Sequence, residues 1–176
     1  MKYYLIMVLV VLSLSPSMGQ NMKPSYGSLQ ITYNKGIGHY EFDKTYVVQN
    51  EGNLFRLRLS FGKYLKENFS LGIGSGFEAF HEPRFNYLPV VLESRYFLST
   101  RRKTPFVSAN FGYSIAGNTF TRGLQYHLGT GFKINQGRAS RSFVGLAYES
   151  HQSMFNSHST WIKSISFSFT YQLLKK

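Results

Sequence analysis

The sequence predicts an all-β protein, a single eight-stranded antiparallel up-and-down β-barrel whose strands cross a membrane. Three observations lead to this prediction. Large apolar residues alternate with small or polar residues in eight separate segments, as they do in strands with two different faces. Beyond the N-terminal region, no segment has the long apolar run of a transmembrane helix. The connections between the segments alternate between short and longer, which is typical of a membrane barrel.

The N-terminal segment has the form of a secretory signal peptide. Lys2 precedes an apolar run over residues 3–14, and small residues such as Ser17 follow before the chain becomes polar. The run is shorter than the ~20 residues of a membrane-spanning helix, which disfavours an uncleaved anchor. We therefore predict a signal peptide over residues 1–19 and an exported barrel domain over residues 20–176.

Eight segments show the two-residue period of a strand. In the clearest of them, Leu57 and Leu59 lie on one face and Arg58 lies on the other. In chain order, the predicted strands are 25–36, 53–65, 68–80, 87–98, 105–116, 123–135, 142–150 and 160–173. The predicted short connections are 66–68, 99–104 and 136–141, and the predicted longer loops are 39–52, 81–86, 117–122 and 151–159.

Small residues indicate which face of the barrel is outside. Opposite the apolar face, strand 68–80 carries Gly72, Gly74 and Gly76, and strand 160–173 carries a row of serines. A secreted soluble ligand-binding β-barrel turns its apolar face inward, so that only this face of glycines and serines would be exposed to water. A narrow membrane barrel turns the bulky face to lipid and has room inside for small side chains. We favour the membrane barrel and keep the soluble barrel as an alternative.

The predicted inner face also carries charges of both signs. We expect them to pair, because an unpaired buried ion is costly. Such pairs would plug a narrow lumen rather than select a solute. The members of this predicted lumen charge network are Arg56, Arg58, Glu78, Glu93, Arg95, Lys133 and Glu149.

The predicted strand ends carry two further features of a membrane barrel. Aromatic residues there are candidates for the girdles at the membrane–water interfaces: Tyr26, Tyr64, Tyr87, Tyr96, Phe97, Tyr113, Trp161 and Tyr171. The short turns and both chain ends are strongly basic, with Glu67 as the opposing acid: Lys23, Lys63, Lys66, Arg101, Arg102, Lys103, Arg138, Arg141, Lys175 and Lys176. We expect this basic rim to face anionic lipid headgroups in the periplasm, and export makes nucleic acid an unsuitable partner.

Three segments carry a resemblance to a known family: residues 87–97, residues 105–113 and the closing alternation of Phe167, Phe169 and Tyr171. They resemble the small outer-membrane β-barrel domain family of Gram-negative bacteria, the OmpA/OmpX-like, porin-type barrels. The resemblance covers nearly all of residues 20–176. It implies a location in the cell outer membrane and contact with outer-membrane lipids and lipopolysaccharide. It also implies recognition of the C-terminal strand by the barrel assembly machinery, and a structural or surface-interaction role.

One constellation could carry chemistry. Glu149, His151 and Ser153 share a predicted strand face near the outer rim, and a serine with a histidine and an acid can form an acyl-transfer site. The His151-x-Ser153 pair resembles the signature of lipid A deacylases, although Met154 follows where that family has Asn. We keep a lipid A deacylase-like outer-membrane hydrolase as an alternative and predict a barrel without intrinsic catalysis. Its interactions would be presented by the loops 39–52 and 151–159.

No metal or cofactor is predicted. The 5 histidines show no metal-ligand spacing, and the chain has 0 cysteines, which excludes thiol-based metal and redox sites.

Overall fold

Strands make up nearly all of the described structure, a computed structural model. It describes residues 24–37, 39–43, 46–49, 53–81, 86–116, 123–137, 139–155 and 158–175. The predicted signal peptide, residues 1–19, lies outside these ranges. The strands are β1 (Ser25–Gly36), β2 (His39–Asp43), β3 (Tyr46–Gln49), β4 (Leu54–Lys66), β5 (Phe69–Phe80), β6 (Asn86–Phe97), β7 (Thr104–Ala116), β8 (Gly123–Gln136), β9 (Ser140–Phe155) and β10 (His158–Lys175).

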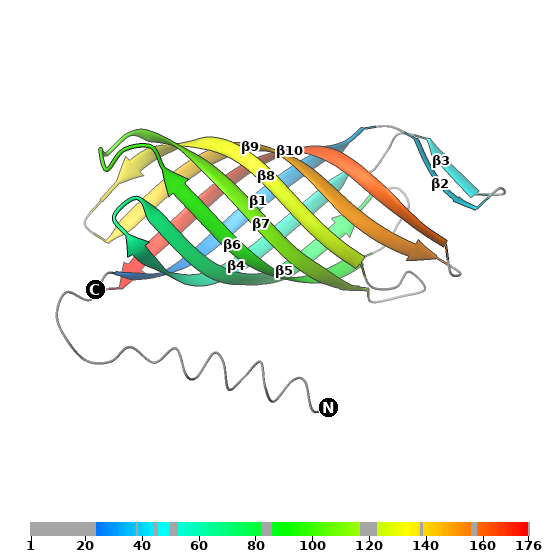
Figure 1. Ribbon diagram of the computed structural model, residues 1–176, viewed down its shortest axis with the longest axis horizontal. Coiled ribbons are helices and arrows are strands. Elements are labelled where there is room, and N and C mark those ends of the chain that lie inside the picture. Colours follow the sequence, from blue (N-terminus) through cyan, green and yellow to red (C-terminus); the bar gives the residue numbers. More distant parts are fainter. Residues whose placement is uncertain are drawn as a thin grey trace, which may run out of the picture.

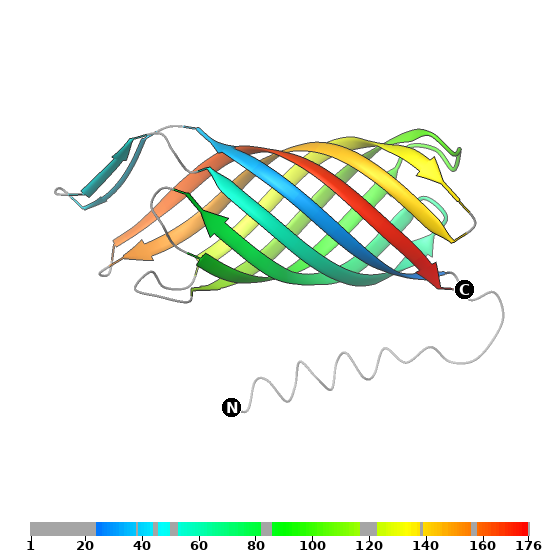
Figure 2. The ribbon, with the colours of Figure 1, turned by 180° about the vertical axis from the view of Figure 1, so that it is seen from behind.

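Eight of these strands close into one antiparallel barrel, in the order β1-β10-β9-β8-β7-β6-β5-β4 (Figures 1 and 2). β1 closes the barrel by pairing with β10 on one side and with β4 on the other, so that Leu29 lies between Tyr171 and Leu59. Closure removes every sheet edge, so the backbone groups of these strands pair with their neighbours, as a hydrocarbon environment requires. The predicted fold class is confirmed.

The two ends of the barrel differ. β1 begins and β10 ends at the same end, which also carries the connections β4–β5, β6–β7 and β8–β9 (Figure 1). We call this the short-turn end and the opposite one the loop end. In barrels of the bacterial outer membrane the short turns face the periplasm and the longer loops face outward. From this rule we expect the short-turn end to face the periplasm.

The first loop-end connection differs from its prediction. β2 and β3 form a separate two-stranded antiparallel sheet that extends past the barrel at the loop end (Figure 1). The prediction of an irregular loop over residues 39–52 is therefore wrong for His39–Asp43 and Tyr46–Gln49. These strands have 5 and 4 residues. Strands this short contain too few alternations to be distinguished from a loop that holds several aromatic residues.

The last loop-end connection is also shorter than predicted. β9 and β10 stay paired from Leu173↔Ser140 to His158↔Phe155, so most of the predicted loop 151–159 is strand. The prediction failed because Met154 and Phe155, the apolar residues of this segment, are adjacent in the chain and give no apolar alternation. A hairpin that continues beyond the lipid has water on both sides, so no apolar alternation marks it in the sequence.

The exterior of the barrel is apolar and the interior is polar. Along β4, every second residue from Leu54 to Ser60 is buried, and Phe55, Leu57 and Leu59 between them are exposed. This pattern recurs around the barrel, where exposed apolar side chains include Phe111, Leu128 and Phe167. An exterior of this kind suits lipid rather than water. It excludes the alternative of a soluble barrel that turns its apolar face inward.

No helix in the described parts of the chain has the length and apolar character needed to cross a membrane.

Two glycines allow an aromatic ring to lie against the inner wall. A Cβ atom added at Gly62 would lie 2.5 Å from the Tyr26 ring, and one added at Gly72 would lie 2.6 Å from the Tyr26 hydroxyl. Real Cβ atoms do not approach other atoms so closely. Glycine at these two positions is therefore what permits Tyr26 to fold across β4 and β5.

A charge placed on the apolar exterior should destabilise the barrel in a depth-dependent way. Phe111, near the middle of β7, and Leu98, beside the short-turn end, are 60% and 61% exposed. We expect Phe111→Arg to lower the free energy of unfolding in lipid vesicles by about 2–4 kcal/mol, and Leu98→Arg by about 0–1 kcal/mol. Denaturant titration of the reconstituted protein measures both values. Equal losses at the two positions would contradict a lipid-facing exterior.

Candidate functional site in the barrel lumen

The centre of the lumen holds a buried arginine between two buried carboxylates. Arg56 Nε lies 2.5 Å from Glu78 Oε1, on the neighbouring strand β5. Its two terminal nitrogens donate to Glu149, with distances of 2.9 Å to Oε1 and 2.8 Å to Oε2. β4 and β9 are separated in the barrel by β1 and β10. The bidentate Arg56–Glu149 pair therefore ties together strands that share no backbone hydrogen bonds.

A second arginine continues this network toward β6. Arg58 Nη1 lies 3.2 Å from Glu93 Oε1, and Arg58 Nη2 lies 3.6 Å from Glu78 Oε1. The Ser60 hydroxyl donates to the same Glu93 oxygen at 3.0 Å. Arg56, Arg58 and Glu78 are at most 2% exposed. Because the arginines alternate with carboxylates, each buried charge has an opposite charge beside it.

Polar side chains satisfy the remaining acceptor sites of Glu149. Asn34 Nδ2 donates to Glu149 Oε2 at 2.6 Å and lies 3.1 Å from the Ser164 hydroxyl. His127 Nδ1 lies 2.9 Å from Glu149 Oε1. Glu149 thus contacts groups from β1, β4 and β8. The small side chains predicted for the inner face leave the space in which these longer side chains meet.

Two of the seven predicted network residues lie elsewhere. Arg95 lies over two rings, with its Cζ 4.5 Å from the centroid of Phe143 and 5.1 Å from that of Phe106. Lys133 Nζ lies 5.4 Å from the centroid of Phe97. Cation–π contacts hold these two cations nearer the short-turn end. The structure therefore brings Arg56, Arg58, Glu78, Glu93 and Glu149 together, but not Arg95 and Lys133 with them.

An aromatic cluster fills the lumen toward the short-turn end. Phe97 lies within 6.2 Å of Tyr64, 5.9 Å of Phe106 and 5.7 Å of Phe143, measured between ring centroids. Tyr26 packs edge-on against Tyr64 at 5.7 Å. We call these five buried residues the aromatic plug. The aromatic plug joins strands β1, β4, β6, β7 and β9 across the interior.

Half of the girdle candidates lie on the barrel exterior, where an interfacial girdle would need them. Tyr96, Tyr113, Trp161 and Tyr171 are exposed on the barrel exterior. The prediction is wrong for Tyr26, Tyr64, Tyr87 and Phe97, which are buried inside. Strand parity could have shown this for Phe97, since it is two residues from the inward-facing Arg95. Aromatic character alone does not distinguish a residue that faces lipid from one that faces the lumen, so the prediction placed these four residues on the wrong face.

The loop end of the lumen is closed around His151. Its ring lies 4.6 Å from the ring of Tyr87 and 5.8 Å from that of Phe80, between centroids. His151 is 6% exposed, and its Nδ1 lies 4.0 Å from Glu78 Oε2. The side chain of Ser153 lies outside the described residues. Glu149 therefore lies inside the barrel, as predicted for the lumen charge network. His151 also lies inside, and not at the outer rim where an acyl-transfer site would need it.

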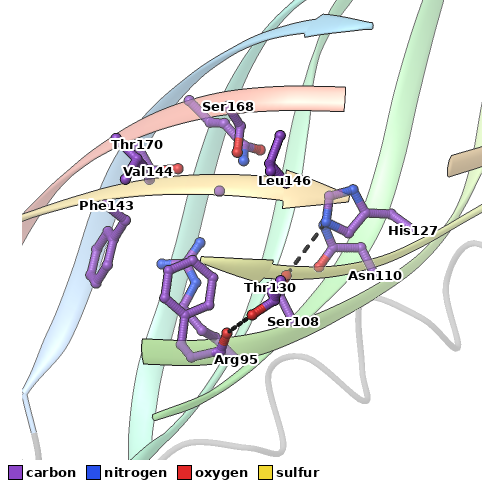
Figure 3. Close-up of a pocket in the computed structure, with 13 residues that line it drawn as sticks. Arg95, Ser108, Asn110, His127, Thr130, Phe143, Val144, Leu146, Ser168 and Thr170 are labelled. Carbon is purple, nitrogen blue, oxygen red and sulfur yellow. Dashed lines mark hydrogen bonds between the residues drawn. The ribbon is translucent and has the colours of Figure 1, made fainter. Parts of the chain in front are cut away.

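A different serine, histidine and acid line up in the lumen. Ser108 Oγ lies 3.4 Å from His127 Nε2 (Figure 3). His127 Nδ1 lies 2.9 Å from Glu149 Oε1. Sequence reasoning missed this row, because its members come from β7, β8 and β9 and only strand pairing brings them together. The adjoining cavity has a volume of about 10 Å³, which is the space of one water molecule. It offers no room for an acyl substrate, and Glu149 is already held by Arg56.

No group of three or more histidine, aspartate or glutamate side chains is arranged to hold a metal ion in the described ranges.

Two solved structures have a similar architecture. Neisserial surface protein A, from Neisseria, superimposes with a TM-score of 0.62 and 12% identity, over 85% of this chain and 96% of that one. The outer membrane enzyme PagL has a TM-score of 0.50 and 14% identity, over 81% of this chain and 97% of that one. Identities this low show a shared fold. No protein-family model and no curated protein sequence matches the chain.

Removing one charge from the lumen network should cost far more stability than removing an exposed charge. We expect Glu149→Gln to lower the free energy of unfolding by about 3–5 kcal/mol, because Arg56 loses a buried partner. The matched control is Glu67→Gln in the exposed β4–β5 turn, where we expect a change within about 0.5 kcal/mol. Denaturant titration in detergent micelles measures both variants. A Glu149→Gln barrel as stable as the control would show that the ion pairs do not support the fold.

Proposed function

We propose that this chain, which has the fold of a small outer-membrane β-barrel, is a non-catalytic barrel with a plugged lumen. Its role is structural or interactive, and it acts through the surface at the loop end. The observation that carries the proposal is the filling of the lumen. The Arg56–Glu149 pair spans the interior, the aromatic plug lies on one side of it, and His151 packs against Phe80 and Tyr87 on the other.

Two small cavities among the described lumen residues support a plugged barrel. One lies beside Arg95 and Ser108 and the next beside Arg58 and His151, and each has a volume of about 10 Å³. A solute larger than water does not fit such spaces. The side chains inside the barrel therefore support the stability of the fold, and these cavities are too small for transport of a solute.

The loop end supports an interactive role. β9 and β10 have 16 and 18 residues, more than the 9–11 or so that a tilted strand needs to cross the hydrocarbon. The β2–β3 hairpin also extends past the barrel and contacts β10. Paired strands beyond the membrane form an ordered platform, on which a partner can bind without first ordering a loop.

The predicted lipid and assembly partners belong to the same proposal. The exposed apolar exterior suits the acyl chains of outer-membrane lipids and of lipopolysaccharide. On β10, Phe167, Phe169 and Tyr171 are exposed on one face. A C-terminal strand of this pattern supports recognition by the barrel assembly machinery.

The described residues give little support to the alternative of a lipid A deacylase-like hydrolase. PagL is an outer membrane enzyme with this fold, so the fold itself does not separate enzymes from other barrels. The buried position of His151 keeps it from a substrate in the outer leaflet. The Ser108–His127–Glu149 row lies beside a cavity with room for one water molecule. The chemistry of these side chains therefore favours a structural role.

A plugged lumen should carry no ionic current. We expect the purified protein, reconstituted in a planar bilayer, to show no discrete conductance steps, because the ion network and the aromatic plug block the path. A general porin reconstituted in the same way is the positive control. Reproducible steps that scale with the amount of inserted protein would overturn the plugged-barrel proposal.

The direction of insertion is tested with epitope tags. A tag inserted between Asp43 and Tyr46, in the β2–β3 hairpin, should bind antibody on intact cells. The matched tag between Thr100 and Lys103, in the β6–β7 turn, should bind only after the outer membrane is permeabilised. These results follow from the rule that short turns face the periplasm. The reverse labelling pattern would show that the loop end does not face the outside.

A further inference from the structure

A pocket of about 270 Å³ lies at the short-turn end of the barrel. Its wall is formed by Tyr64 and Lys66 on β4, Thr100 in the β6–β7 turn, Lys133 on β8 and Arg141 on β9. These elements come from well-separated parts of the barrel wall, and Tyr64 belongs to the aromatic plug. The pocket is therefore the mouth of the lumen, closed on its inner side by the plug.

Cations dominate this mouth. Lys66, Lys133 and Arg141 line the pocket, and Glu67 is the acid in the lining. Among the described residues, no carboxylate lies within ion-pair distance of Arg141. Further exposed cations surround the pocket on the turns and on the end of β10: Arg101, Arg102, Lys103 and Lys175. A concave site with this excess of one sign attracts anions.

Two buried N–H groups beside the pocket have no hydrogen-bond acceptor in the described structure. They are Arg141 Nε and Gln172 Nε2, on residues that face each other in the β9–β10 register. Gln172 is fully buried, and its Oε1 accepts from the Tyr64 hydroxyl at 2.7 Å. Because a buried donor without an acceptor is costly, a ligand with several acceptor oxygens would suit this position.

The guanidinium group of Arg141 is held in place without an acid. Its Cζ lies 4.4 Å from the centroid of the Tyr64 ring. A cation–π contact uses the face of the ring and leaves the in-plane N–H donors available. Arg141 is thus positioned by the Tyr64 ring, and its buried Nε has no acceptor among the described residues.

We propose that the short-turn mouth of the barrel is a binding site for a phosphoryl group, held by Lys66, Lys133 and Arg141. Arginine matches phosphate oxygens in a bidentate way, and lysine supplies a point charge. The volume of about 270 Å³ is far larger than the cavity of about 10 Å³ that has the space of one water molecule, so a phosphate with part of its ester group fits. The group could be presented by a phospholipid headgroup of the periplasmic leaflet or by a free phosphate.

The test uses the refolded full barrel in maltoside micelles, which carry no phosphate, at about 150 mM salt to weaken diffuse attraction. The probes are phosphatidylglycerol added to the micelles and inorganic phosphate. We expect saturable binding of at least one probe by calorimetry. Arg141→Gln and Lys133→Met should each weaken it by about tenfold or more, as the loss of a charged hydrogen bond does. The matched control, Arg101→Gln, removes a cation outside the pocket and should change it by less than about twofold.

Each arm of this experiment has a defined reading. Binding of phosphatidylglycerol alone identifies a lipid headgroup, and comparable binding of inorganic phosphate identifies a free anion. Either result supports the site if the pocket variants lose it. Equal losses of binding in Arg101→Gln and Arg141→Gln would overturn the site and indicate diffuse attraction to the rim. Absence of binding of both probes would also overturn the site.

Folding of the variants is checked by the heat-dependent change in gel mobility that folded barrels show. Lys66→Gln changes an exposed pocket residue, so it keeps the test valid if the more buried positions do not tolerate substitution. This site lies at the end opposite the loop-end surface of the proposed function. A negative result for the phosphoryl site would therefore not count against the proposed function. A negative result for the proposed function would not count against the phosphoryl site.

Discussion

The need to satisfy every backbone polar group inside a membrane determines the rest of this structure. Hydrocarbon offers no hydrogen-bond partners, so the strands must pair with one another until the sheet closes. Closure at eight strands makes the interior narrow, and narrowness decides which side chains can face inward. The glycines, the serines and the few long polar side chains of the lumen follow from this one constraint.

The same narrowness gives the buried charges their arrangement. A carboxylate from β9 can meet an arginine from β4 across the interior only because small residues line the strands between them. Arg56, Glu78 and Glu149 are expensive to bury one at a time, and their mutual contacts offset that cost. The network therefore links distant strands, and it occupies the space through which a solute would otherwise pass. The buried ion network and the lack of space for a wide channel therefore both follow from the narrow interior.

The two ends of the barrel meet different surroundings, and their side chains differ accordingly. At the loop end, β9, β10 and the β2–β3 hairpin extend the paired backbone beyond the lipid. At the short-turn end, cations such as Lys133 and Arg141 lie against aromatic rings rather than carboxylates. The arginines at the centre, by contrast, contact carboxylates of the lumen.

The sequence by itself determined the barrel, the strands β1 and β4 to β8 to within one or two residues, and the inward position of charges such as Arg56 and Glu149. These features depend on a two-residue period, which is a local property of the chain. Only the tertiary structure decided which charges meet, that Arg95 and Lys133 contact rings, and that Ser108, His127 and Glu149 form a row. Those contacts join residues far apart in the chain, and they depend on how strand pairing and barrel closure place one strand relative to another. The β2–β3 hairpin and the upper parts of β9 and β10 also needed the structure. β2 and β3 are too short to show a period, and residues 151–159 have no apolar alternation that would mark a strand.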